Sequence, residues 1–150
     1  MRILVTGTQP RRPSRSFVLD LDGRPRAVTP EGVVATAISP DGQRVAAFDP
    51  SGKILLYRVA GGDPDVAPGP TENGDIGPWS PDGRAVFVSV VDGVYMHIFR
   101  RDLATGRRNS VRDFTLADPA GLTFASPIIS ADGRTYALQF CARSIKPLLG

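Results

Sequence analysis

The tetrapeptide Ser39-Pro40-Asp41-Gly42 recurs as Ser80-Pro81-Asp82-Gly83 and, with alanine in place of proline, as Ser130-Ala131-Asp132-Gly133. In this tetrapeptide the proline presets φ for a turn and the aspartate can hydrogen-bond nearby backbone. The glycine can take the positive φ that lets a second strand begin. We therefore predict that each copy is a hairpin turn between two strands.

The flanks of these turns repeat as well. A large apolar residue precedes each serine, and a short apolar stretch follows each glycine, at residues 44–48, 85–90 and 135–140. Between these units lies a second repeat, in which an apolar stretch runs into a glycine turn and a polar stretch follows. Its apolar parts begin at residues 16, 54 and 94, and its polar parts are 24–29, 63–67 and 107–113. Four short strands in roughly 40 to 50 residues are typical of a β-propeller blade.

We therefore predict an all-β fold, a partial β-propeller of about 3 to 3.5 four-stranded antiparallel blades in a single domain over residues 1–150. The predicted units are about 2–29, 34–68, 76–113 and 123–150. Residues 2–6 would be the second strand of a blade without its first, and 144–150 are too few for two closing strands. A ring of six or seven blades needs roughly 240 to 300 residues. We therefore expect either part of a longer propeller or a homodimer that completes the ring; a β-sandwich is the alternative fold.

Composition supports a turn-rich β-protein. The 150 residues include 16 Gly and 14 Pro, and acids and bases are almost entirely Asp and Arg. Because Glu and Lys favour helices, a helix bundle is excluded. One cysteine, Cys141, excludes an intramolecular disulfide and is expected to be structural. The net charge of +3 is spread along the chain, so a nucleic-acid partner is not expected.

No residue pattern predicts catalysis, and we expect no cofactor and no metal. His97 is the only histidine and lies in an apolar strand, where a packed or half-exposed strand residue is favoured over a Ser-His-Asp triad. A zinc site of the usual composition is excluded by one His and one Cys. The segment Asp20-Leu21-Asp22-Gly23 begins like a calcium loop but lacks its later ligands and its closing Glu. We therefore predict that the chain is not an enzyme.

The turn Ser80-Pro81-Asp82-Gly83-Arg84 and its apolar strand resemble the TolB-like, WD-repeat-like propeller repeats of bacteria, and residues 99–107 resemble a typical turn of these repeats. This resemblance covers about residues 2–140. The order of residues 29–32, 38–42, 55–57, 61–62 and 118–121 is most similar to the C-terminal propeller of some eukaryotic-like serine/threonine protein kinases. The repeats also resemble the propellers of prolyl-oligopeptidase-type peptidases. The catalytic motifs of both groups are missing, and Ala131 and residues 141–150 depart from the pattern.

The resemblance implies a non-enzymatic scaffold or sensor module that binds a protein or a small ligand. The alternative is the propeller fragment of a kinase, or of a peptidase, whose catalytic domain lies outside this chain. Propellers usually bind at the rim of the central channel, so we predict partner contacts at Asp75, Trp79, Thr123 and Ser126. Trp79 has a second interpretation, as a core residue between blades.

Localisation follows only as an expectation. The apolar stretch at the N-terminus is too short for a signal peptide, and the sequence contains no membrane-spanning stretch. This favours the cytoplasm, whereas the C-terminal part of a membrane-anchored receptor kinase would be periplasmic.

Overall fold

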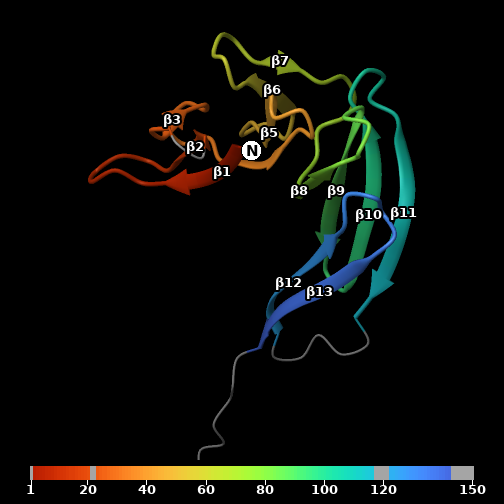
Figure 1. The fold of residues 1–150 in the computed structure, drawn as a ribbon. Helices are drawn as coiled ribbons and strands as arrows, with labels where there is room; N and C mark the ends of the chain where they lie inside the picture. Colours follow the sequence, from red (N-terminus) through yellow and green to blue (C-terminus); the bar gives the residue numbers. More distant parts are fainter. Residues whose placement is uncertain (1, 21–22, 117–121, 143–150) are drawn as a thin grey trace, which may run out of the picture.

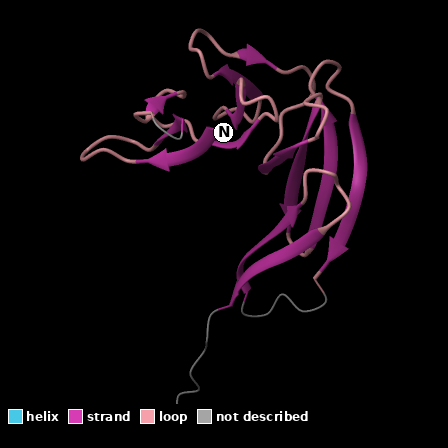
Figure 2. Ribbon diagram, in the orientation of Figure 1, coloured by secondary structure: helices cyan, strands magenta, loops and turns pink. Residues whose placement is uncertain are grey.

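The computed structural model describes residues 2–20, 23–116 and 122–142, and these residues form strands and turns without a helix (Figure 2). The strands are β1 (Arg2–Gly7), β2 (Arg15–Asp20), β3 (Arg26–Ala27), β4 (Ala35–Ile38), β5 (Arg44–Phe48), β6 (Ile54–Arg58), β7 (Asp65–Val66), β8 (Asp75–Trp79), β9 (Ala85–Asp92), β10 (Tyr95–Asp102), β11 (Arg108–Thr115), β12 (Leu122–Ile129) and β13 (Tyr136–Ala142). In this part of the chain no helix is long and apolar enough to cross a membrane.

The strands form four antiparallel sheets, which we number blades 1 to 4 in chain order. Blade 1 has the order β1-β2-β3, and blade 4 the order β12-β13. Blade 2 (β4-β5-β6-β7) and blade 3 (β8-β9-β10-β11) have four strands each. The sheets follow one another around an open arc, with β8 inside and β11 outside (Figure 1). This arrangement confirms the predicted all-β, partial β-propeller fold.

The fourth strands differ in length from the prediction. The polar stretches 24–29 and 63–67 contribute only the two-residue strands β3 and β7, whereas β11 continues to Thr115. Pro25 and Pro64 precede the short strands, and proline cannot donate a ladder hydrogen bond. No proline interrupts residues 107–115, which allows β11 to pair along nearly the full length of β10.

All three copies of the repeated tetrapeptide form the same turn. The Ser Oγ to Asp Oδ1 distance is 2.5 Å in each copy. The serine Oγ also accepts a hydrogen bond from the backbone N–H that opens the next strand, at 2.9 to 3.0 Å. Gly42, Gly83 and Gly133 have φ of 68°, 67° and 72°, a conformation that favours glycine.

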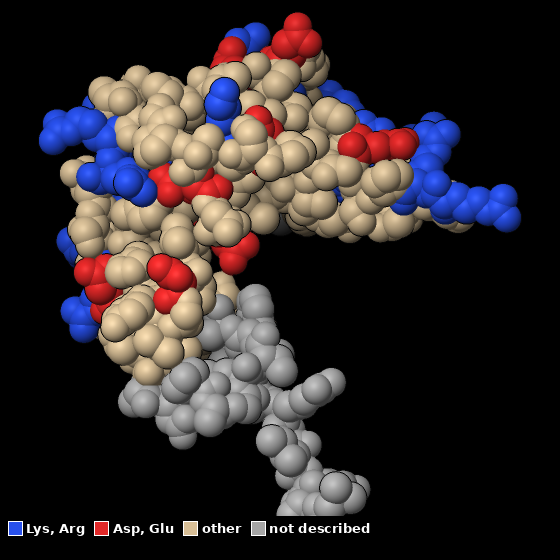
Figure 3. All heavy atoms as spheres, turned by 180° about the vertical axis from the view of Figure 1, so that it is seen from behind, with Lys and Arg blue, Asp and Glu red and all other residues tan. Residues whose placement is uncertain are grey.

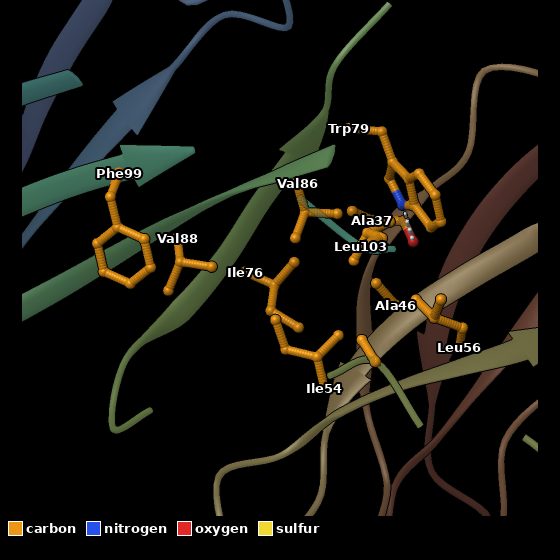
Figure 4. Close-up of a cluster of buried hydrophobic side chains, with 11 residues drawn as sticks. Ala37, Ala46, Ile54, Leu56, Ile76, Trp79, Val86, Val88, Phe99 and Leu103 are labelled. Carbon is orange, nitrogen blue, oxygen red and sulfur yellow. Dashed lines mark hydrogen bonds between the residues drawn. The ribbon is translucent and has the colours of Figure 1, made fainter. Parts of the chain in front are cut away.

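The core consists of apolar clusters between successive blades. The cluster in Figure 4 joins blade 2 to blade 3, and its side chains include Ile54, Ile76 and Val88. Trp79 is 2% exposed there and donates from its indole Nε1 to Ala37 O at 3.4 Å. A second cluster joins blade 1 to blade 2, and a third joins blade 3 to blade 4. The apolar faces of neighbouring blades thus cover one another.

Arginines tie neighbouring blades together at the turns. Arg2 of β1 donates to Gly42 O at 2.8 Å, and Arg44 of β5 donates to Gly83 O at 3.4 Å. The Arg44 guanidinium also lies 5.0 Å from the centre of the Trp79 ring, within cation–π distance. Each of these arginines therefore fixes the turn of the next blade.

Replacing Ser80 by alanine should destabilise the fold by about 1–3 kcal/mol, because Ser80 is buried and Asp82 Oδ1 and the Ala85 N–H would lose their partner. Ser130→Ala removes the equivalent bonds at a more exposed turn and provides a matched control. Urea unfolding of both variants measures the difference. Equal losses would contradict this account.

Acid should weaken the turns. Hydrogen bonds from the Ser80 hydroxyl and the Arg84 N–H hold the pKa of Asp82 below its ordinary value of 3.8, and Asp41 and Asp132 are held low in the same way. A carboxyl whose pKa falls on folding adds stability above its unfolded pKa, and this stability is lost as pH falls through the folded pKa. Urea midpoints should therefore decline below pH 3.8, and less steeply in Asp82→Asn than in the control Asp92→Asn.

Candidate functional site

The first strands of blades 2, 3 and 4 line the inside of the arc. β4 packs against β8, and β8 contacts β12. Each of these strands ends directly before a repeated turn, at Ile38, Trp79 and Ile129, so the turns fix where each inner strand ends. Two neighbouring hollows lie along this surface.

The first hollow is a cavity of about 160 Å³ between blade 3 and blade 4. Its apolar wall includes Phe87, Ile98 and Ile129, all buried. Asp75 and Ser126 supply polar groups to its lining. This cavity, which we call the inter-blade cavity, therefore combines an apolar wall with polar groups.

The second hollow, which we call the inner groove, is an open volume of about 670 Å³ that crosses three blades. Blade 2 supplies residues from Thr36 to Pro40, blade 3 residues from Gly77 to Pro81, and blade 4 Ile129 and Ala131. Gly77 and Ile129 also line the inter-blade cavity, so the two hollows adjoin. None of the described residues that line the inner groove is charged.

The predicted contact residues lie in different places. Asp75 and Ser126 meet at the inter-blade cavity. The side chain of Thr123 lies outside the part that the structure describes. Trp79 lines the inner groove but is 2% exposed, because it fills the space between blades 2 and 3. Its burial in the cluster between these blades agrees with the second interpretation, a core residue, and a partner contact at Trp79 stays a prediction.

A buried arginine fixes the loop that leads into β8. Arg101 of β10 is 0% exposed, and its Nη atoms donate at 2.8 Å to Pro68 O, Pro70 O and Glu72 Oε1. Burial lowers the pKa of the Arg101 guanidinium, while Glu72 opposes this effect. Since arginine does not lose its proton in proteins, the pair remains an ion pair. We call this contact the Arg101 clamp.

Sequence reasoning missed the Arg101 clamp. Glu72 lies 29 residues before Arg101, in a loop without repeat pattern. The sequence signal for the clamp is a pair of glycines, Gly69 and Gly106, at which a side chain would collide with it. A Cβ at Gly69 would lie 2.5 Å from Arg101 Nη2, and a Cβ at Gly106 would lie 2.5 Å from Pro68 O.

The described residues contain no group of three or more His, Cys, Asp or Glu side chains that could hold a metal ion. His97 Nδ1 lies 2.9 Å from Asp113 Oδ1 in a pair that links β10 and β11, and both side chains are about half exposed or more. Neither residue lines the inter-blade cavity or the inner groove. The non-enzymatic character of the chain stays a prediction.

Comparison with known proteins bears on the fold. No family model matches the sequence, and no curated protein matches it. Among solved structures, the chain is similar to TolB from Acinetobacter baumannii, with a TM-score of 0.65 and 20% identity. The match covers 90% of this chain and 35% of TolB, so the chain spans about a third of its length. The likeness shows a TolB-like β-propeller fold; the similarity to kinase propellers stays a prediction.

Gly69→Ala should destabilise the protein by about 1–3 kcal/mol more than Gly61→Ala, because only the former places a methyl group against Arg101. Both glycines have positive φ, 110° and 98°, and nothing lies within 4 Å of a Cβ at Gly61. The pair therefore separates the clash from the backbone strain that both share. Urea unfolding measures the two values, and similar losses would show that the Arg101 clamp tolerates the added group.

Proposed function

We propose that the chain is a non-enzymatic β-propeller module that binds a partner through an uncharged, apolar segment seated in the inner groove. The observation that carries this proposal is the groove itself, which crosses three blades and has a charge-free lining. We propose an extended polypeptide segment as the occupant, because the groove runs across three blades, and a small apolar ligand is the alternative. The inter-blade cavity next to it offers Asp75 and Ser126 for a polar group of the partner.

The physical properties of the groove support this use. It is built on the ends of β4, β8 and β12 and on the repeated turns that follow them, and the Arg101 clamp fixes the loop that enters β8. A preformed site loses less conformational entropy on binding. Apolar burial contributes roughly 25 cal/mol per Å² of surface, whereas a charged partner would be left without counter-charges here.

The charged side chains lie elsewhere. In the view from behind, Lys and Arg gather at the periphery, most clearly at the end of the arc formed by the β1–β2 hairpin, with Asp and Glu interspersed (Figure 3). This face shows no continuous basic stripe of the kind that nucleic-acid binding uses. This supports a protein or an apolar ligand as partner.

The ends of the arc support completion of the propeller by further blades. Ile3 and Val5 in blade 1 are 44% and 36% exposed, and Ile128 and Leu138 in blade 4 are 52% and 41% exposed. Apolar faces of this kind are covered between the inner blades. We propose that the remainder of a longer chain, or a second copy, supplies the missing cover. Attachment to a kinase or peptidase domain remains a prediction from the sequence resemblance.

A photo-crosslinking residue tests the groove. Benzoylphenylalanine in place of Thr36 should crosslink a partner polypeptide in a cell extract, whereas the same residue in place of Tyr95, which is outside the groove and 54% exposed, should not. Gly77→Leu should reduce the crosslink about tenfold by filling the groove, since a partner's apolar group would lose its place there.

Folding of Gly77→Leu serves as the control. A Cβ at Gly77 would make ordinary contacts, 3.4 Å to Phe87 O and 3.7 Å to Ile129 Cγ2, on the wall that the inner groove shares with the inter-blade cavity. The circular dichroism spectrum of Gly77→Leu must match that of the wild type before the loss of the crosslink counts as loss of binding. Equal crosslinking from Thr36 and Tyr95, or a crosslink that Gly77→Leu does not reduce, would refute the groove as the binding site.

A further inference from the structure

One edge of β1 has no strand beside it in the described part of the chain. In blades 2 and 3 the second strand lies between two others, β5 between β4 and β6 and β9 between β8 and β10. In blade 1 the corresponding strand, β1, pairs only with β2. A groove of about 500 Å³ lies between β1 and β4, and we call it the β1 groove.

The repeat relates each residue of β1 to a residue of β5. The pair Arg2↔Asp20 in blade 1 corresponds to Arg44↔Arg58 in blade 2, so Ile3 corresponds to Val45 and Val5 to Ala47. Val45 and Ala47 are 0% and 1% exposed, whereas Ile3 and Val5 are 44% and 36% exposed. Val45 and Ala47 belong to the apolar cluster that joins blade 1 to blade 2, so the exposure of Ile3 and Val5 marks the face of blade 1 that none of the described blades covers.

The backbone at this edge is positioned for pairing. In β5 the Arg44 N–H and C=O bond to Ser39, toward β4, whereas Gln43 and Asp49 bond toward β6. Backbone direction alternates along an antiparallel strand. By correspondence, the N–H and C=O groups of Arg2, Leu4 and Thr6 face the open edge. Such unpaired groups are a template for an added strand.

The lining of the β1 groove defines the chemistry of the occupant. Leu4 and Thr6 supply its wall from β1, and Val34, Thr36 and Ile38 supply it from the side of β4. In blade 2 the strand at this place ends in Ile38-Ser39, and the Ser39 Oγ accepts the Arg44 N–H at 2.9 Å. Blade 3 repeats this arrangement with Trp79-Ser80 and the Ala85 N–H at 3.0 Å.

We propose that β1 receives an extended strand from a partner polypeptide, antiparallel to β1, with an apolar residue opposite Ile3 and a serine directly after it. The serine hydroxyl accepts the N–H of Arg2, as Ser39 and Ser80 do for their own blades. The added strand lies beside β4 as β4 lies beside β8, so it continues an existing series of contacts. In this chain the first strands β4, β8 and β12 already pair with the second strands of their own blades. A second copy would have to give up such a pair to donate a first strand, so we favour a different polypeptide as the donor. The β1 groove shares Thr36 and Ile38 with the inner groove, and the rest of its lining belongs to β1 and to residues 34–35.

A synthetic peptide with the sequence of residues 33–43 is the probe, because it has the pattern of a first strand and its turn. Fluorescence anisotropy with the full chain should detect its binding, and a scrambled peptide should not bind. Thr6→Pro removes a donor from the open edge and should weaken binding about tenfold or more. Thr6→Val keeps the N–H and should bind the peptide normally.

A second variant keeps the test independent of any effect of proline on folding. Val34→Glu places a charge in the β1 groove from the other side, at a residue that is 38% exposed, and should also weaken binding. Gly77→Leu should bind the peptide normally, which separates this result from the inner-groove test. The proposal is overturned if the peptide does not bind, or if Thr6→Pro and Val34→Glu bind as wild type. Sedimentation that shows a dimer lost in Thr6→Pro would overturn the partner in favour of a second copy.

Discussion

The hydrogen bond between the serine hydroxyl and the aspartate carboxylate of each repeated turn is the constraint on which the architecture depends. It joins the first and third residues of the turn, and the same serine Oγ accepts the N–H of Ala85, the first residue of the next strand. The turn thereby sets the register of the first two strands of a blade. That register places a large apolar residue, such as Trp79, between neighbouring blades. One local contact, repeated at blade spacing, determines both the hairpins and the surfaces through which the blades pack.

The local part of this fold could be predicted from the sequence, since turn chemistry and apolar stretches are local signals. The three turns and the apolar strands follow from residue types within a few positions. The polar pattern predicts longer fourth strands than β3 and β7, because it carries no signal for the ladder hydrogen bonds that Pro25 and Pro64 cannot donate. The Arg101 clamp and the inner groove could not be foreseen, since the clamp joins β10 to a loop about 30 residues earlier and the groove combines residues of three blades. For Trp79 the sequence left two interpretations, and burial decided between them.

Fold and function are separate conclusions for this chain. The likeness to TolB concerns the arrangement of the blades, and a propeller can present many kinds of surface on the same frame. What distinguishes this chain is the distribution of its surfaces. A charge-free groove crosses the inner strands, while the arginines lie toward the outside and between the turns. The open edge of β1 adds a surface of a different type, in which backbone groups rather than side chains would make the main contacts.

The arginine contacts between turns, like the other side-chain hydrogen bonds between blades, join residues about one repeat apart in the sequence. Among the described residues, no side-chain hydrogen bond joins positions more than 42 apart, and the longest, from Trp79 to Ala37, spans about one blade. Interactions that reach only the nearest unit make stability a sum over neighbours, as in other repeat proteins. Duplication of one blade would then leave the existing contacts intact and create copies of them at the new junction. A gene that encodes such a unit can lengthen by whole blades without first redesigning a core.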